Sequence, residues 1–249
     1  MPRFLLASPH AGLQNEKGHN DNMKKTHSKL LVLLSAAVLW APTLTTADAP
    51  SAANADDALK LLLEGNHRFV TGSLNSVTRD EIAQRRAELV HGQKPFAIVL
   101  CCSDSRVGPE IVFDQELGNI FVVRTAGEVL DAAGIGSIEY AVAHLGSPLL
   151  LVLGHEHCGA VAAAVADARE PGQIANIVMA IRPAVAKTKG SPGDALQNAV
   201  RANVQEIVAR LRTTSPVLAE AVKAGRLKVT GAVFSLKTGS VDLVPDESK

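Results

Sequence analysis

The 249-residue sequence is poor in aromatic residues and in cysteine, and it has no excess of charge of either sign. Aromatic residues make up 3% of it, too few to suggest a surface on which nucleic-acid bases stack. Its 25 basic residues balance its 25 acidic residues, so its charge does not indicate a polyanion as a partner. Three cysteines are far fewer than a small disulfide-stabilised protein uses. These features favour a globular protein that does not bind nucleic acid.

The sequence also lacks an uninterrupted apolar run of about 20 residues, the length that a membrane span requires. A shorter apolar run at 30–41 follows several lysines and precedes Ala47-Asp48-Ala49, which is the pattern of a signal peptide with its cleavage site. We therefore predict a signal peptide at 23–49 and a mature protein that is periplasmic or secreted and not bound to the membrane. Residues 1–22 do not fit a signal peptide. We interpret them as a non-native or unstructured extension before the true start at Met23.

The remaining chain, after a linker at 50–55, forms one predicted domain at 56–249. Asp56 or Asp57 is expected to cap its first helix, and Thr78 with Glu81 has the spacing of a capping box for the second. Strand-like runs occur at 96–101, 120–124, 148–154, 227–234 and 241–244. Helix-like runs occur at about 57–70, 78–90, 136–145, 159–168, 173–187, 194–212 and 216–224.

Continuous apolar strands separated by helices are typical of a parallel sheet that is covered on both faces. The last two strand-like runs flank Thr238-Gly239, so they are expected to form an antiparallel hairpin at the edge. The sequence therefore predicts a single α/β domain with a central, mostly parallel sheet, flanking helices and an antiparallel edge strand at the C-terminus. Ligands of such sheets bind beyond the carboxyl ends of the strands.

Two short segments follow predicted strands and carry residues that bind metals. They are Cys102-Ser103-Asp104-Ser105-Arg106 and Gly154-His155-Glu156-His157-Cys158-Gly159. Two thiolates and one imidazole suit zinc, and three protein ligands leave a fourth position open, as catalytic zinc sites do. We predict one Zn²⁺ per chain, bound by Cys102, His155 and Cys158. A Cys102–Cys158 disulfide is the alternative, but the neighbouring histidine and aspartate favour a metal.

Asp104 and Arg106 lie two residues apart on an extended turn, so the guanidinium can bind the carboxylate through two hydrogen bonds. This pairing would keep Asp104 ionised and away from the zinc, free to accept a proton or a hydrogen bond from water on the metal. We predict that the two residues form a catalytic pair, with Asp104 as a possible fourth ligand in a closed state. The simpler alternative is an ion pair that only ties the loop.

The motif Cys-x-Asp-Ser-Arg, followed about fifty residues later by Gly-His-x-x-Cys-Gly, resembles the signature of the β-class carbonic anhydrases. The segments 62–70, 121–127, 136–146, 180–185 and 215–239 are similar to that family as well. The resemblance implies reversible hydration of carbon dioxide to bicarbonate and a proton, by a zinc-bound hydroxide with the aspartate–arginine pair. It also implies a homodimer or a homotetramer.

By the same resemblance, Tyr140 is expected in the substrate pocket at a dimer contact, and Gln115 lies near a position where glutamine can bind substrate. Glu128 departs from the family, which usually has asparagine there. Some members bind regulatory bicarbonate through a tryptophan. The one tryptophan of this sequence, Trp40, lies in the predicted signal peptide, so no such site is expected.

Two other functions are compatible with these residues. A carbonyl sulfide or carbon disulfide hydrolase could use the same framework with a different pocket, and a zinc-binding protein without turnover could use the same ligands. His157 is not expected to bind the metal, because three ligands and water already complete a tetrahedral site. Cys101 ends a buried strand and faces the opposite side from Cys102, which predicts an unreactive core thiol.

Overall fold

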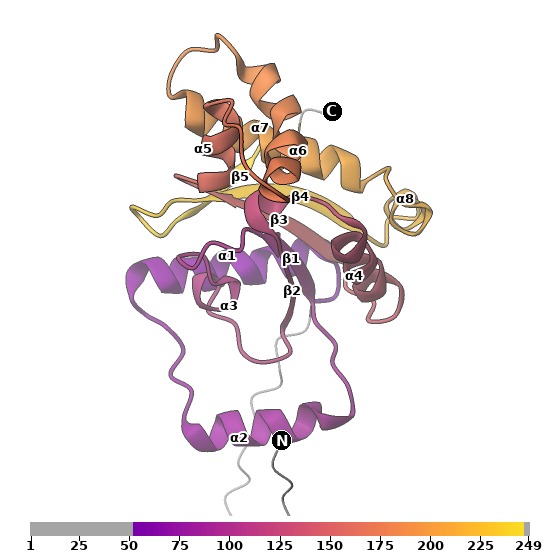
Figure 1. The fold of residues 1–249 in the computed structure, drawn as a ribbon. Coiled ribbons are helices and arrows are strands. Elements are labelled where there is room, and N and C mark those ends of the chain that lie inside the picture. Colours follow the sequence, from indigo (N-terminus) through magenta and orange to yellow (C-terminus); the bar gives the residue numbers. More distant parts are fainter. Residues whose placement is uncertain (1–51, 247–249) are drawn as a thin grey trace, which may run out of the picture. The chain divides into compact units, whose positions relative to one another are not determined.

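Five strands form one sheet in the order β2-β1-β3-β4-β5 (Figure 1). The computed structural model describes residues 52–246. The strands are β1 (Ala97–Cys101), β2 (Ile120–Arg124), β3 (Leu149–His155), β4 (Lys228–Phe234) and β5 (Val241–Val244). The first four run parallel, and β5 pairs with β4 in the antiparallel direction at the edge. The predicted sheet, including its antiparallel edge strand, is confirmed.

Helices pack on both faces of the sheet. The helices on one face are α4 (Ala132–Ala143), α5 (Gly159–Val165), α6 (Ile174–Thr188), α7 (Ala195–Leu211) and α8 (Pro216–Lys223). The other face carries α1 (Ala55–Thr71) and the short α3 (Pro109–Val112). The helix α2 (Arg79–Glu88) and the 3-10 turns η1 (Leu89–His91) and η2 (Ala126–Glu128) complete the described elements.

The central strands β1 and β3 are buried on both faces. Ile98 and Leu100 of β1 lie in the core cluster under α4 to α8, whereas Val99 and Cys101 lie in the cluster next to α1. Full burial of one such aliphatic side chain stabilises the folded state by about 1.5–3 kcal/mol. This is why the two strands are continuous apolar runs and show no alternation of polar and apolar residues.

The buried side chain of Asn66 connects α1 to two distant parts of the chain. Its Nδ2 donates to the carbonyl oxygens of Val112, at 3.1 Å, and Gly239, at 2.8 Å. Its Oδ1 accepts from the amide of Val241 at 2.9 Å. One amide group therefore fixes α1 against α3 and against the hairpin between β4 and β5. Gly239 lies in that turn with φ of 77°, a conformation that glycine adopts without steric strain.

Helix α7 lies close to the sheet because glycines face it on β3 and β4. A Cβ atom at Gly154 would lie 2.6 Å from Cγ2 of Val204, and one at Gly231 would overlap the same valine. Val204 is fully buried and β-branched, so it cannot turn aside easily. The two glycines thus set the depth at which α7 packs.

Two predicted helix starts are wrong, and both errors concern the capping residue. Helix α1 is capped by Asn54, whose Oδ1 accepts from the amides of Asp56 at 2.8 Å and Asp57 at 3.0 Å. The aspartates expected as caps are therefore in the first turn, where their charge favours the helix N-terminus. Helix α4 begins at Ala132, before the expected Gly136, because Asp131 caps it. The capping box of α2 is present as predicted.

Several sequence-based predictions fall partly or wholly outside the described residues. The predicted extension at 1–22 and the signal peptide at 23–49 lie there, whereas the end of the predicted linker overlaps α1, which begins at Ala55. Within residues 52–246, no helix combines the length and the apolar character that crossing a membrane requires. The short helix α3 was not anticipated from the sequence, although Pro109 at its first position is a common helix start.

Candidate metal centre

The parallel pairing of β1 with β3 brings the two predicted metal-binding segments together. Cys101 is the last residue of β1 and pairs with Leu153 of β3. Cys102 directly follows β1, and His155 is the last residue of β3. Cys158 is the N-terminal cap residue of α5. All three predicted ligands therefore emerge at the carboxyl ends of neighbouring strands, where α/β sheets bind their ligands.

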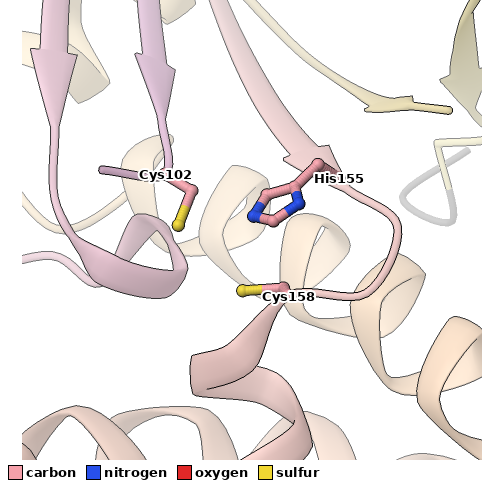
Figure 2. Close-up of side chains that lie close together, drawn as sticks. All are labelled: Cys102, His155 and Cys158. Carbon is pink, nitrogen blue, oxygen red and sulfur yellow. The ribbon is translucent and has the colours of Figure 1, made fainter. Parts of the chain in front are cut away.

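The side chains of Cys102, His155 and Cys158 point into one common space (Figure 2). One ligand atom from each, two sulfurs and a ring nitrogen, lies within 4.8 Å of the other two. All three residues are buried, with exposed fractions of 5%, 0% and 1%. Among the described residues this is the group of three or more histidine, cysteine or acidic side chains that could hold a metal ion.

His155 has one ring nitrogen engaged with the protein and one without a partner. Its Nδ1 lies 2.8 Å from the carbonyl oxygen of Glu156, so Nδ1 carries the hydrogen and donates it. Its Nε2 is buried and has no hydrogen-bond partner in the described part of the chain. A buried polar atom without a partner is unfavourable, and a metal ion beside the two sulfurs would supply one. The donor set of two sulfurs and one nitrogen fits zinc.

The electrostatics of the two thiols differ sharply. A hydrogen bond from Cys158 is the main factor that lowers the pKa of Cys102, to about 4, against the opposing effect of burial. The amide of Gly127 donates to the Cys102 sulfur and stabilises the thiolate further. The pKa of Cys158 is raised, first by its hydrogen bond to Cys102 and then by burial. In the metal-free protein the two sulfurs thus share a proton, which a metal ion would displace.

Cys101 takes no part in this cluster. It faces the opposite core cluster from Cys102, as the alternation along a strand requires. Burial raises the pKa of the Cys101 thiol to about 12, so it stays protonated. All three cysteines are free, and the alternative disulfide between Cys102 and Cys158 is not formed in this structure.

Asp104 and Arg106 form the expected bidentate ion pair. The Nε of Arg106 donates to Oδ1 of Asp104 at 2.9 Å, and Nη2 donates to Oδ2 at 2.7 Å. The backbone amide of Arg106 also donates to Oδ1 at 2.9 Å. These hydrogen bonds hold the pKa of Asp104 well below its usual range. Oδ2 of Asp104 lies 3.8 Å from Nε2 of His155, so an ionised carboxylate borders the candidate metal centre.

His157 contributes its backbone to the site. It has φ of 53°, an uncommon conformation for a non-glycine residue, in the turn between β3 and α5. Its carbonyl oxygen accepts from Nη2 of Arg106 at 3.4 Å, which links the two motif segments. Its side chain does not belong to the ligand cluster.

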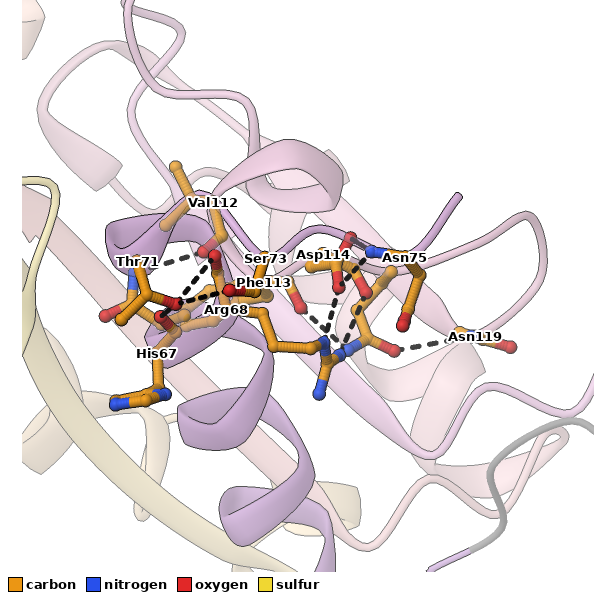
Figure 3. A network of polar contacts seen from close by, with 11 residues as sticks. His67, Arg68, Thr71, Ser73, Asn75, Val112, Phe113, Asp114 and Asn119 are labelled. Atoms are coloured by element: carbon orange, nitrogen blue, oxygen red, sulfur yellow. Dashed lines mark hydrogen bonds and ion pairs between the residues drawn. The ribbon is translucent and has the colours of Figure 1, made fainter. Parts of the chain in front are cut away.

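The two residues predicted for a substrate pocket contact residues other than the three ligands. Gln115 donates from Nε2 to the carbonyl oxygen of Phe113 at 2.7 Å, and its Oε1 accepts from Asn119 at 3.3 Å. The neighbouring Asp114 pairs with Arg68 of α1 at 2.5 Å and anchors this segment (Figure 3). Tyr140, on α4, is half exposed, and its ring centroid lies 5.1 Å from that of His144. Their roles in substrate binding stay predictions.

The structure adds three residues that sequence reasoning did not place at the site. Arg124, at the end of β2, donates to the carbonyl oxygens of Cys102 at 3.0 Å and Asp104 at 2.7 Å. The sequence signal for Arg124 was a charged residue at the end of an otherwise apolar strand. Glu128 and Asn203 are buried polar residues beside the cluster. The signal for Asn203 was a polar residue on the apolar stripe of a helix.

Comparisons with known proteins agree with this geometry. A family model described as carbonic anhydrase matches residues 97–241. Carbonic anhydrase 2 of Mycobacterium tuberculosis is 42% identical over 186 residues, which cover 73% of this chain and 89% of that protein. A carbonic anhydrase of Mycolicibacterium smegmatis is 40% identical over 190 residues, covering 75% of this chain and 91% of that protein. The Coccomyxa β-carbonic anhydrase, solved in complex with acetazolamide, superposes with a TM-score of 0.60 at 28% identity, covering 75% of this chain and 86% of that one.

The pKa values of the cysteines predict the order in which they react. When the metal-free protein is treated with iodoacetamide at neutral pH, Cys102 is expected to be alkylated before Cys101, because the thiolate is the nucleophile. Peptide mass spectrometry at successive times measures the order. The unfolded protein is the control, in which both cysteines should react at similar rates. Labelling of Cys101 as fast as Cys102 in the folded protein would contradict the assignment.

Proposed function

This chain belongs to the β-class carbonic anhydrase family, and we propose that it catalyses the reversible hydration of carbon dioxide to bicarbonate and a proton. One observation carries the proposal. The unpartnered Nε2 of His155 lies within 4.8 Å of the sulfurs of Cys102 and Cys158, and the ionised Asp104 lies next to it. Carbon dioxide is neutral and reacts with a nucleophile, and the attacking water has to lose a proton. A metal ion at the cluster can activate that water, and Asp104 is placed beside it.

Cys102, His155 and Cys158 would hold one Zn²⁺ per chain. Two thiolates balance the charge of the ion, which makes a buried site acceptable in electrostatic terms. When bound there, zinc supplies a Lewis acid that lets water act as a nucleophile near neutral pH. The protein keeps the imidazole in the correct tautomer through the bond from its Nδ1 to the Glu156 carbonyl oxygen.

Asp104 is proposed to accept a proton or a hydrogen bond from water at the metal. Three hydrogen bonds from Arg106 fix the orientation of the carboxylate and keep it ionised. Because the pKa of Asp104 is lowered, the ion pair persists through neutral and mildly acidic pH and is lost only as the pH falls through that lowered value. Arg124 donates to the backbone carbonyl oxygen of Asp104, so a second guanidinium group holds the loop that carries the carboxylate.

We also propose that the chain assembles into a homodimer or a homotetramer. Several large apolar side chains stay more than half exposed on the single chain, among them Val90 at 70%, Ile111 at 65% and Leu117 at 53%. An interface between copies of the chain would remove these groups from water. The half-exposed Tyr140 would lie at such a contact, next to the substrate pocket.

The direct test measures metal and turnover together. We expect about one zinc per chain and rapid carbon dioxide hydration by stopped flow, and we expect Cys158→Ser to lose both, because zinc prefers thiolate to a hydroxyl ligand. Cys101→Ser is the matched control and should keep both. Full zinc content in Cys158→Ser would remove the ligand assignment. Faster turnover of carbonyl sulfide than of carbon dioxide would instead identify a hydrolase on the same framework.

The Asp104–Arg106 pair makes a separate prediction. In Arg106→Ala, Asp104 loses its partner and is expected to turn to the metal as a fourth ligand, which gives an inactive protein with full zinc content. Asp104→Asn should keep the metal and lose turnover by about 10²-fold or more, the usual contribution of a positioned proton acceptor. Crystal structures and kinetics of both variants provide the measurements.

The control for this pair is Arg182→Ala, which removes the exposed ion pair with Asp167. It should change neither zinc content nor turnover, because exposed pairs contribute little. Near-native turnover in Arg106→Ala would show that the pair only ties the loop.

We further propose that the protein is exported, with cleavage after Ala49. The support is the pattern of residues 23–49. Because Trp40 is the one tryptophan, the mature protein should show no tryptophan fluorescence, and its intact mass should correspond to a chain that begins at Pro50. Both are measured on protein from the periplasmic fraction. Full-length mass with tryptophan emission in the cytoplasmic fraction would disprove export.

A further inference from the structure

The turn η2 contacts one of the candidate metal ligands through its backbone. The amide of Gly127 donates to Sγ of Cys102, with 3.3 Å between nitrogen and sulfur. The turn holds two consecutive residues in the left-handed region, Gly127 with φ of 65° and Glu128 with φ of 55°. Glycine adopts this conformation freely, whereas a glutamate there is strained. The surrounding structure must therefore hold the turn in place.

Asn203 of α7 provides that support. Its side chain is buried, and its Nδ2 donates to the carbonyl oxygen of Gly127 at 2.9 Å and to Oε2 of Glu128 at 3.3 Å. One amide group thus binds both left-handed residues. The residues beside it in sequence and one turn along, such as Val204 and Ile207, are apolar core residues. A single asparagine on that face is consistent with a specific role for its amide.

Steric contacts leave this turn and this helix little freedom. A Cβ atom at Gly127 would lie 2.7 Å from Cδ1 of Ile181 on α6 and 3.1 Å from Cβ of Ala160 on α5. Val204, the next residue after Asn203, packs against the glycines of β3 and β4 and so sets how closely α7 approaches the sheet. These contacts therefore fix the distance between Asn203 on α7 and the 126–128 turn.

Glu128 is compatible with a site that carries thiolates. Its Oε2 accepts from Asn203, and its Oε1 is buried without a hydrogen-bond partner among the described residues. Burial, reinforced by the negative charge of Cys102, raises the pKa of Glu128 well above its usual value. A protonated carboxyl adds no further negative charge next to the sulfur.

We propose that Asn203 is a positioning residue for the metal centre, which holds the 126–128 turn so that the Gly127 amide donates to the Cys102 sulfur. This inference rests on the proposed zinc site. A hydrogen bond from an amide draws charge from a thiolate and fixes its direction. Without it, the direction of the Cys102 sulfur is no longer fixed, so the site should bind the metal less tightly. The sulfur also keeps more negative charge, which makes water at the metal less acidic. The pKa that governs the pH–rate profile of hydration should then rise.

The test compares Asn203→Leu with Asn198→Leu. Both asparagines lie on α7 and donate from Nδ2 to a carbonyl oxygen, but the partner of Asn198 is Pro192, in the loop before the helix. We expect Asn203→Leu to fold, to bind zinc about 10–100-fold more weakly in competition with a chelator, and to show a raised kinetic pKa. Asn198→Leu should match the wild type in both measurements. Unchanged zinc affinity and kinetic pKa in a folded Asn203→Leu would overturn the proposal.

A spectroscopic measurement tests the hydrogen bond itself. In wild-type protein loaded with cadmium-113 and labelled with ¹⁵N-glycine, the Gly127 amide proton should show scalar coupling to the metal through the sulfur. This coupling should be lost in Asn203→Leu. If that variant does not fold, the wild type still decides, because bound cadmium without coupling to Gly127 overturns the inference. Failure of the wild type to bind zinc or cadmium at the three ligands would instead overturn the proposed function.

Discussion

The candidate metal centre depends on the register between β1 and β3. Their parallel pairing places Cys101 opposite Leu153, so Cys102 leaves the sheet next to His155. A shift of one residue would move a ligand by about 3.3 Å along the strand and turn it to the other face. Seven consecutive pairs between β3 and β4, from Leu149 to His155, hold β3 in this register. The geometry of the ligands is thus a property of the whole sheet.

Burial sets the electrostatic requirements of the centre. Charged sulfurs removed from water are unfavourable unless a cation or hydrogen-bond donors compensate them. The described residues provide the amide of Gly127 for Cys102 and the bidentate Arg106 for Asp104, which borders the site with 17% of its side chain exposed. The remaining unpartnered atom of the ligand set is Nε2 of His155. Among the described residues, Oε1 of Glu128 is the other buried side-chain atom without a hydrogen-bond partner, and it lies at the periphery of the site. The ligand set thus has one free nitrogen, which the proposed metal ion would use.

The sequence predicted the sheet and the ligand cluster because both depend on local patterns. Apolar runs gave the strands to within one or two residues, and the short segments that follow them contain Cys102, His155 and Cys158. The start of α4 was missed because capping depends on the local backbone, and several residues near a helix start can serve as caps.

The residues around the cluster could not be predicted from one sequence, because their partners lie far along the chain. Asn203 binds residues 75 and 76 positions away, and the guanidinium of Arg124 reaches back 20 and 22 positions. Such contacts follow from the packing of α7 and from strand pairing. A polar residue on an apolar stripe marks Asn203 itself, but no short stretch of sequence indicates which distant residues it contacts.

The bonds of Asn66 also constrain the order in which the chain can fold. Its partners Gly239 and Val241 are 173 and 175 residues further along, so the sequence separation is close to the length of the domain. Closing so long a loop has an entropic cost, and contacts of this kind slow folding. During synthesis, Asn66 leaves the ribosome long before these two partners exist. The docking of α1 against the β4–β5 hairpin is therefore a late event, and a chain that ends before β5 leaves the buried Oδ1 of Asn66 without its donor, the amide of Val241.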